Sequence, residues 1–145
     1  RTDDALTLAC SDPEIPTDEQ NLVIKAALLL RRRYPHMGGG AALELVKRTP
    51  SGAGMGGGSA DAAAALVLLS RLWGVSPTRD ELHAMAAELG ADVPFFLMGG
   101  TASAGGRGEV LTPLPTPPLW LVLLRPAVSV NTGWAYGRWR PESCR

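Results

Sequence analysis

The sequence predicts an α+β fold on the strength of three observations. Apolar residues recur at helical spacing in three separate segments. Other segments alternate, or form short apolar runs, in ways that are typical of strands. A long glycine loop separates one strand candidate from the helix candidate that follows it. Because 145 residues suffice for one domain with a real core, we expect these helices and strands to share one core.

The first third of the chain is expected to form a strand, a helix and a second strand. Residues 5–9 alternate as in a strand. A helix is expected to begin at Thr17, since Thr17 and Gln20 match the capping-box pattern, and to end near Tyr34. Residues 42–47 then form a strand candidate with apolar residues on one face, and this strand leads into the glycine loop.

Two further helices are expected after the loop. The first covers residues 59–72 and presents a stripe of alanine and leucine. The second begins at Thr78, which forms a capping box with Glu81, and ends at Gly90.

The last third is expected to be mostly extended. Residues 101–111 predict a glycine-containing hairpin, and the apolar run 119–124 predicts a fully buried strand. A turn and a new helix are expected at Asn131.

Composition excludes several classes of function. Lys plus Arg and Asp plus Glu both number 14, so no overall basic field attracts nucleic acid or an anionic membrane. The two cysteines and two histidines show no metal-ligand spacing, and the apolar run is too short to span a bilayer. We expect a cytoplasmic protein. Because the chain begins without methionine and ends in a polar stretch, we also expect an internal portion of a longer protein.

The glycine loop predicts a site for a polyphosphate. Glycines let several peptide N–H groups converge on an anion, and the following helix turns its positive end to the same point. The loop lacks the lysine of a Walker motif, and its G-x-G-x-x-G spacing follows Thr49-Pro50 without an acidic ribose partner. A flexible linker is the alternative. The predicted nucleotide-binding residues are Pro50, Ser51, Gly52, Ala53, Gly54, Met55, Gly56, Gly57, Gly58, Ser59 and Ala60.

Three segments together resemble one known family. They are the loop and helix start at 50–64, the G-A-D-V-P-F-F segment at 90–96 and the G-R-G-E segment at 106–109. They resemble the GHMP kinase superfamily, and within it the kinases of a cytidine diphosphate-linked polyol in isoprenoid synthesis. The resemblance implies a partial GHMP kinase-like N-terminal domain (ribosomal protein S5 domain 2-like) at 1–125, and the start of a C-terminal domain at 126–145.

The resemblance also implies the chemistry. It implies a small-molecule kinase that uses ATP and Mg²⁺, phosphorylates the polyol, and binds neither nucleic acid nor membrane. Asp92 would be the catalytic base and contact the substrate. From the residues alone, its apolar neighbours predict a desolvated carboxylate, although a turn residue before a proline is the alternative. The P-x-K-x-N-L strand that supplies a lysine in this family does not occur in the sequence.

Other positions leave alternatives open. Thr132 and Tyr136 match positions where similar kinases hold the substrate, but a helix cap and a core aromatic would give the same pattern. Ser59 could add a hydroxyl near phosphate or Mg²⁺, whereas Asp61 would suit the positive end of any helix. Another kinase of the superfamily, or a nucleotide-binding chain without catalysis, remains the alternative function.

Overall fold

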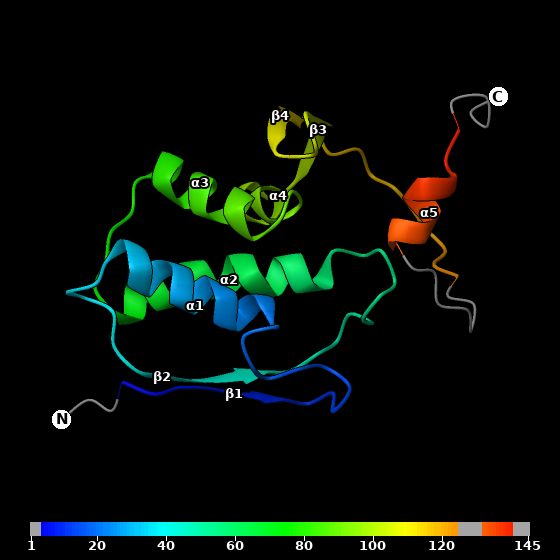
Figure 1. Ribbon diagram of the computed structural model, residues 1–145. Helices are drawn as coiled ribbons and strands as arrows, with labels where there is room; N and C mark the ends of the chain where they lie inside the picture. The colour runs from blue at the N-terminus through cyan, green and yellow to red at the C-terminus, as the bar shows by residue number, and fades with distance from the viewer. Residues whose placement is uncertain (1–3, 125–131, 141–145) are drawn as a thin grey trace.

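A computed structural model describes residues 4–124 and 132–140, without the side chains of Thr132 and Tyr136. The elements stack in layers, from the β1–β2 sheet through two layers of helices to a hairpin (Figure 1). This arrangement confirms the α+β prediction. In chain order the elements are β1 (Leu6–Cys10), α1 (Leu22–Arg33), β2 (Ala41–Leu45), α2 (Gly57–Leu72), α3 (Arg79–Leu89), α4 (Val93–Met98), β3 (Thr101–Gly105), β4 (Val110–Leu114) and α5 (Thr132–Arg138).

The first layer is a β1–α1–β2 unit. β1 and β2 pair in parallel, with Leu6 opposite Ala41 and Cys10 opposite Leu45. Parallel strands need a crossover connection, and α1 supplies it. Leu8 and Ala41 are buried on the face that α1 covers. Both strands therefore end at the same edge of the sheet, where the glycine loop begins.

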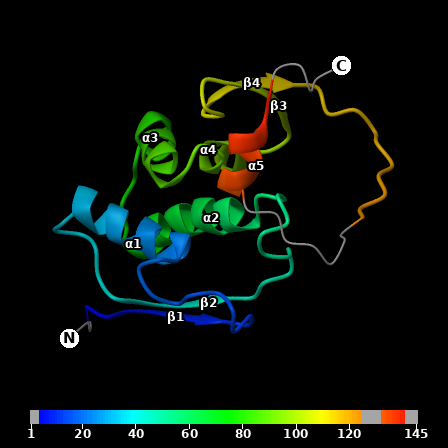
Figure 2. The ribbon, with the colours of Figure 1, turned by 45° about the vertical axis from the view of Figure 1, so that its right-hand side comes forward.

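The core lies between the sheet and the helices. α1 and α2 pack side by side above the sheet, and α3 and α4 form the next layer (Figures 1 and 2). α4 thus contacts α2, the helix that follows the glycine loop. The largest fully buried side chains are Leu30, Leu66, Leu69, Met85, Val93 and Pro94.

The start of α1 differs from the sequence prediction. The helix begins at Leu22 and not at Thr17, because Asn21 is its N-cap and accepts a hydrogen bond from the Val23 N–H at 2.9 Å. The Thr17–Gln20 segment instead turns around Asp18, whose carboxylate accepts from the Gln20 N–H at 2.9 Å. Short polar side chains that bond to nearby backbone compete with helix formation, and here Asp18 does so.

The two helices after the loop follow the prediction closely. α2 begins at Gly57, two residues earlier than expected, and ends at Leu72 as expected. The capping box of α3 is present, with Thr78 and Glu81 bonded in both directions, and Gly90 is its C-cap. The predicted hairpin is also confirmed, since β3 and β4 are antiparallel.

The apolar run 119–124 is not a buried strand, so that prediction was wrong. It forms no strand in the structure, and Trp120 is 100% exposed. A buried strand needs neighbours on both faces and a partner for its backbone, and in the part of the chain described none pairs with this run. Hydrophobicity alone therefore predicted burial that the tertiary context does not supply.

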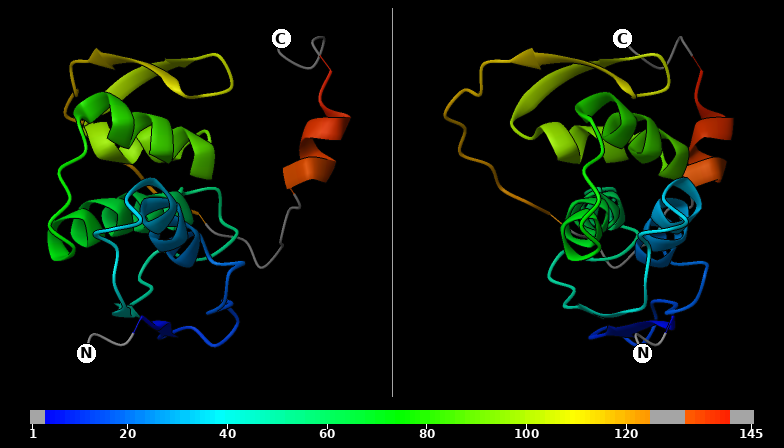
Figure 3. Two further views of the ribbon diagram at one scale, coloured as in Figure 1. Left: turned by 60° about the vertical axis from the view of Figure 1, so that its left-hand side comes forward. Right: turned by 90° about the vertical axis from the view of Figure 1, so that its left-hand side faces the viewer.

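The C-terminal part is described least. α5 stands apart from the other helices, as the left view of Figure 3 shows. The predicted domain boundary at 125–126 and the helix start at Asn131 fall in residues 125–131, outside the described residues. Among the described residues, no helix has the length and apolar character needed to cross a membrane.

Candidate functional site

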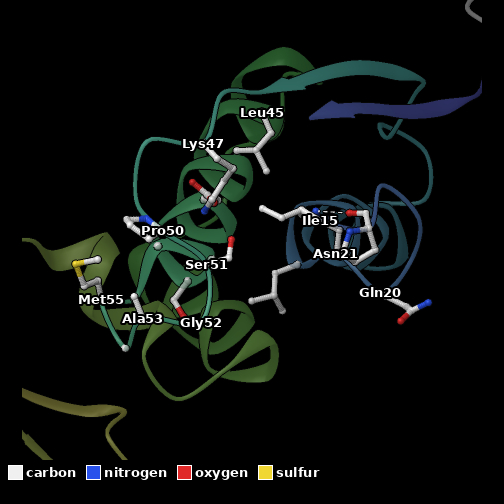
Figure 4. A pocket seen from close by; sticks show the side chains of 18 residues that line it. Ile15, Gln20, Asn21, Leu45, Lys47, Pro50, Ser51, Gly52, Ala53 and Met55 are labelled. Carbon is white, nitrogen blue, oxygen red and sulfur yellow. Dashed lines mark hydrogen bonds and ion pairs between the residues drawn. The ribbon is translucent and has the colours of Figure 1, made fainter. Parts of the chain in front are cut away.

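A cavity of about 330 Å³ lies where the two parallel strands end. Its volume is at the lower end of the range for small-molecule sites, which is about 300–1,000 Å³. One wall comes from the connection between β1 and α1, and the other from the glycine loop and the start of α2 (Figure 4). The lining residues are Ile15, Pro16, Gln20, Asn21, Leu22, Leu45, Lys47, Asp61 and all ten residues from Pro50 to Ser59.

The glycine loop takes its path from left-handed backbone. Gly52, Gly54 and Gly56 have φ of +66°, +69° and +65°, which residues with a Cβ rarely adopt. The residues between them lie in the ordinary half of φ space. This alternation bends the chain sharply around the cavity and delivers it to the first turn of α2.

The start of α2 presents unused N–H groups beside this cavity. The first helical bond runs from the Ala60 N–H to the Gly56 carbonyl at 2.9 Å, and no side chain caps the helix. The N–H groups of Gly57, Gly58 and Ser59 find no acceptor among the described residues. Together with the positive end of the helix, these donors suit an anion such as a phosphate group.

The glycines at the loop end are required for two different reasons. A Cβ at Gly56 would lie 2.5 Å from Cζ of Phe96, so the α4 ring packs directly on this glycine. Gly57 does not have a positive φ. It is constrained instead by space, because its Cβ would lie 3.1 Å from Thr49 and 3.3 Å from Nζ of Lys47.

A buried lysine stands beneath the loop, and the sequence analysis missed it. Lys47 follows β2, lines the cavity and forms an ion pair with Asp61 of α2, with Nζ and Oδ2 2.6 Å apart. The side chain of Lys47 is only 7% exposed, and that of Asp61 is 25% exposed. The sequence analysis predicts no role for Lys47, because this residue belongs neither to a Walker motif nor to a P-x-K-x-N-L segment. The sequence does contain a signal for this pair. It is a lysine shortly before the loop together with an acid in the helix that follows.

The opposite wall of the cavity is mainly apolar. Ile15, Leu22 and Leu45 line it, and Figure 4 shows Ile15 and Asn21 facing the loop residues Pro50 and Ser51 across the cavity. The Asn21 side chain is held in place, because its Nδ2 donates to the Pro16 carbonyl at 2.7 Å while its Oδ1 caps α1. An apolar wall opposite a set of N–H donors and one ammonium suits a ligand with a flat apolar part and an anionic tail.

Asp92 lies outside this cavity and is exposed, so the expectation of a desolvated carboxylate was wrong. It is the N-cap of α4, where Val93 and Pro94 turn inward and are buried while the carboxylate faces outward. Apolar neighbours in sequence therefore did not become its neighbours in space. Its Oδ1 lies 3.6 Å from the position of a Cβ on Gly108.

The G-R-G-E segment forms the turn of the β3–β4 hairpin beside Asp92. Gly106 and Gly108 have positive φ, and the Glu109 carboxylate accepts from the Arg107 N–H at 2.9 Å. Backbone N–H donors, its own and that of Arg107, lower the pKa of Glu109. The fold thus brings together two segments that the sequence analysis had linked only by resemblance.

The predicted site residues divide into three groups. Pro50 to Ser59 line the cavity, whereas Ala60 lies inside α2 with its N–H used in the helix. Asp92 is on the exposed surface at the start of α4. Thr132 and Tyr136 belong to α5, but their side chains lie outside the described residues.

A resident metal has no dedicated ligand set in the part of the chain that the structure describes. No group of three or more His, Cys, Asp and Glu side chains comes together there. The Ser59 hydroxyl and the Asp61 carboxylate line the cavity and are oxygen donors of the kind that suit Mg²⁺, which is commonly held by one or two protein groups plus substrate phosphates.

Comparison with known proteins decides the family. The family described as "GHMP kinases N terminal domain" matches residues 21–100, which include both the glycine loop and Asp92. The chain belongs to the GHMP kinase family. In GHMP kinases ATP is the phosphate donor, and the glycine loop at the start of α2 is consistent with this use.

Similar proteins carry one name. The 4-diphosphocytidyl-2-C-methyl-D-erythritol kinase of Acaryochloris marina is 48% identical over 141 residues, covering 96% of this chain and 45% of that protein. The kinase of the same name from Synechococcus elongatus is 50% identical over 137 residues, covering 93% and 43%. That of Salinibacter ruber is 46% identical over 145 residues, covering 95% and 51%. The chain thus spans about half the length of the curated relatives it matches.

A solved structure agrees with these relatives. A crystal structure of a 4-(cytidine 5'-diphospho)-2C-methyl-D-erythritol kinase superimposes with a TM-score of 0.75 and 39% identity. It covers 95% of this chain, and this chain covers 49% of it. The fold described above is therefore that of a GHMP kinase N-terminal domain in part.

Proposed function

We propose that the protein containing this chain transfers the γ-phosphate of ATP to the 2-hydroxyl of 4-diphosphocytidyl-2-C-methyl-D-erythritol. The observation that carries the proposal is the cavity, in which the glycine loop and the free N–H groups of α2 face an apolar wall. The relatives named above support the choice of substrate.

ATP would lie along this cavity with its two ends on opposite walls. The N–H groups of Gly57, Gly58 and Ser59 would donate hydrogen bonds to the phosphate oxygens at the positive end of α2. The adenine base would rest against Ile15, Leu22 and Leu45, where an apolar surface removes its faces from water. This orientation sends the terminal phosphate toward the loop end that Phe96 of α4 contacts.

Asp92 would act as the base at that end. The hydroxyl oxygen of the polyol forms a bond to the γ-phosphorus, the bond from that phosphorus to the β–γ bridging oxygen breaks, and ADP leaves. The hydroxyl proton passes to the Asp92 carboxylate. The Ser59 hydroxyl would help to hold a Mg²⁺ ion that accompanies the nucleotide, and this ion would supply positive charge to neutralise the phosphates.

The position of α4 relative to the loop supports this role for Asp92. Asp92 begins α4, and Phe96 on the same helix packs on Gly56. The short helix α4 thus fixes the position of the Asp92 carboxylate relative to Gly56, the N-cap of α2. An exposed carboxylate is also accessible to a substrate that binds over it.

The test is ADP release by the protein at the full length of its relatives. Turnover with ATP is measured with 4-diphosphocytidyl-2-C-methyl-D-erythritol and, in parallel, with mevalonate. We expect ADP only with the cytidine compound. Turnover on mevalonate alone would instead assign another kinase activity of the family. Saturable ATP binding without turnover on either compound would identify a nucleotide-binding protein.

A further inference from the structure

We propose that Glu109 is a positioning residue for Asp92, because its carboxylate fixes the turn of the β3–β4 hairpin that lies beside Asp92. The inference deepens the proposed function and rests on it, since Asp92 is the base proposed there. The hairpin lies over α4 in Figures 1 and 2, and Asp92 is the N-cap of that helix. Two segments of the chain therefore meet at this carboxylate, the start of α4 and the hairpin turn at residues 106–109.

The hairpin turn approaches Asp92 at Gly108. A Cβ on Gly108 would lie 3.6 Å from Oδ1 of Asp92 and 3.7 Å from Cβ of Ala91, which are ordinary van der Waals distances. A side chain at position 108 would thus cover one side of the carboxylate. Glycine leaves that space open to the hydroxyl of a substrate. The path of the turn therefore controls access to Asp92.

The turn needs restraints to keep this path. Gly106 and Gly108 have φ of +67° and +126°, and glycine loses more conformational freedom on folding than any other residue. One restraint is a backbone bond from the Gly108 N–H to the Gly105 carbonyl at 3.0 Å. This bond closes the base of the turn, so the peptide between Gly106 and Arg107 at its tip needs a further contact.

The Glu109 carboxylate supplies that contact. It accepts from the Arg107 N–H at 2.9 Å, and it folds back over Gly106, where a Cβ would lie only 2.9 Å from Oε1. Backbone N–H donors, that of Glu109 itself first and then that of Arg107, lower the pKa of Glu109, so its carboxylate is ionised at neutral pH. Hydrogen bonds to an ionised acceptor are about twice as strong as neutral ones. This side chain therefore holds the tip of the turn in place.

The Asp92 carboxylate has no such support of its own. It makes no side-chain cap bond at the start of α4, and no hydrogen bond to it is found among the described residues. A base works only when it is held in line with the hydroxyl, and a displacement of about 1 Å can cost about 100-fold in rate. With α4 on one side, the hairpin turn is the neighbour that limits where this carboxylate can lie.

A purely structural role in the hairpin is the competing explanation. A residue that only stabilises the turn would lower stability and turnover whatever stands at position 92. A residue that acts through Asp92 loses its effect once the Asp92 carboxylate is gone. A double-mutant cycle on kcat separates the two roles.

The first experiment measures kcat for Glu109→Ala, Asp92→Asn and the double variant, in the protein at the full length of its relatives. We expect Glu109→Ala to lower kcat about 10- to 100-fold through a misplaced base, with ADP affinity unchanged. In the Asp92→Asn background the same substitution should cause no further loss. Equal fold-losses in both backgrounds, or a normal kcat in Glu109→Ala, would overturn the inference.

Two matched variants control for charge and for stability. Glu109→Gln removes the charge but keeps an acceptor oxygen, so it should retain most of the turnover. Glu81 also accepts a backbone N–H, that of Thr78 at 2.7 Å, but it lies in the first turn of α3, whereas Asp92 follows the last turn of that helix. Glu81→Ala should therefore lower Tm and leave kcat unchanged. A kcat loss in Glu81→Ala as large as that in Glu109→Ala would contradict the positioning role.

A second substitution keeps the inference testable if Glu109→Ala does not fold. Gly106→Ala keeps the Glu109 charge, but its Cβ would displace the carboxylate from the Arg107 N–H. Gly74→Ala is its control, because Gly74 has nearly the same φ, +65°, and nothing lies within 4 Å of the position of its Cβ. We expect a loss of kcat in Gly106→Ala alone. Equal kcat values in the two variants would overturn the inference.

A readout that needs no turnover separates this inference from the proposed function. In protein labelled with ¹³C-aspartate, the carboxyl signal of Asp92 is identified by its loss in Asp92→Asn. We expect this signal to move in Glu109→Ala and to stay nearly in place in Glu109→Gln, which removes the same charge.

The combined outcomes are distinct. A moved signal without phosphorylation of the cytidine compound would keep the placement of Asp92 by Glu109 and refute the kinase reaction. Phosphorylation with an unmoved signal would refute the inference alone. An unmoved signal without phosphorylation would refute both.

Discussion

The two sides of α2 differ in how much of a site they contain. On the side of the sheet, this chain lines an open cavity, to which a buried ion pair and unused N–H groups contribute. On the side of α4, Asp92 is exposed and lies outside the cavity. Local geometry therefore supports the proposed nucleotide site, whereas the role proposed for Asp92 rests on the family resemblance and on the contact of α4 with the loop.

Phe96 connects the two sides. Its ring packs on Gly56, the N-cap of α2, while its own helix begins at Asp92. A change at this contact should therefore affect both sides, and changes elsewhere should affect one.

The largest effect is expected from Gly56→Ala. The new Cβ would lie 2.5 Å from the Phe96 ring, and the residue would have to keep a φ of +65°. Strained backbone and overpacking together should lower the free energy of unfolding by about 2–5 kcal/mol. We expect a lower Tm and a loss of ADP affinity, measured by thermal unfolding and by titration.

Gly54→Ala is the matched control for that substitution. Gly54 has nearly the same φ, +69°, but nothing lies within 4 Å of the position of its Cβ. Gly54→Ala should therefore lower the free energy of unfolding only through backbone strain, by about 1–2 kcal/mol. Equal losses in both variants would mean that the Phe96 contact contributes nothing.

The next largest effect is expected from a substitution on the α4 side of α2 alone, at the exposed Asp92. In the protein at the length of its relatives, Asp92→Asn should lower kcat about 10²- to 10⁴-fold, because the amide cannot accept the hydroxyl proton. ADP affinity should stay unchanged, since Asp92 does not line the cavity. Asp80→Asn, at an exposed acid in the first turn of α3, is the control. Normal turnover in Asp92→Asn would leave Asp92 a turn residue.

A smaller effect is expected from pH at the N-terminus of α3, which packs against α4. The Thr78 N–H, which donates to the Glu81 carboxylate at 2.7 Å, lowers the pKa of Glu81 from its ordinary value of 4.5. The stabilisation is therefore present above pH 4.5 and is lost as the pH falls through the lowered pKa.

Glu81→Gln isolates this charge, because glutamine keeps the acceptor oxygen of the capping box. Urea unfolding of both proteins at pH 7 and at pH 3 is the measurement. We expect the variant to be less stable than the unmodified chain at pH 7, and we expect this difference to be smaller at pH 3. A difference that does not change with pH would assign the effect to something other than the carboxylate charge.

The smallest effect is expected from a substitution at Trp120, which lies on neither side of α2. Trp120 is 100% exposed, so Trp120→Lys should change the free energy of unfolding by less than about 0.5 kcal/mol. Denaturant unfolding of the chain measures this. A loss of several kcal/mol would show that the run 119–124 is buried after all, as its sequence suggests.

Local patterns predicted local structure well. The capping box at Thr78, the glycine stop at Gly90 and the hairpin after Thr101 were predicted correctly, because each depends on neighbours in sequence. The capping box at Thr17 was wrong, because Asp18 and Asn21 offered the backbone better bonds that the pattern did not weigh.

Features that depend on the tertiary fold were missed. The Lys47–Asp61 pair joins residues on two elements that come together only when β2 and α2 are placed. The exposure of Asp92 depends on how α4 sits on α2, which its apolar neighbours in sequence did not reveal. The glycine loop and the helix after it are visible in the sequence, and Pro50 to Ser59 line the cavity, whereas nucleotide binding by Pro50 to Ala60 stays a prediction.

The crossover between β1 and β2 has a consequence for folding kinetics. Both walls of the cavity depend on strands that meet only after the chain between them has closed, and the Ser11 N–H bonds to the Leu45 carbonyl at 3.0 Å across that closure. Such non-local pairing is slow to form. Under the proposed function a nucleotide would bind only the closed arrangement, so ADP at 100 times its Kd should add about 2.7 kcal/mol to the free energy of unfolding. That gain should appear mainly as slower unfolding, with the refolding rate almost unchanged.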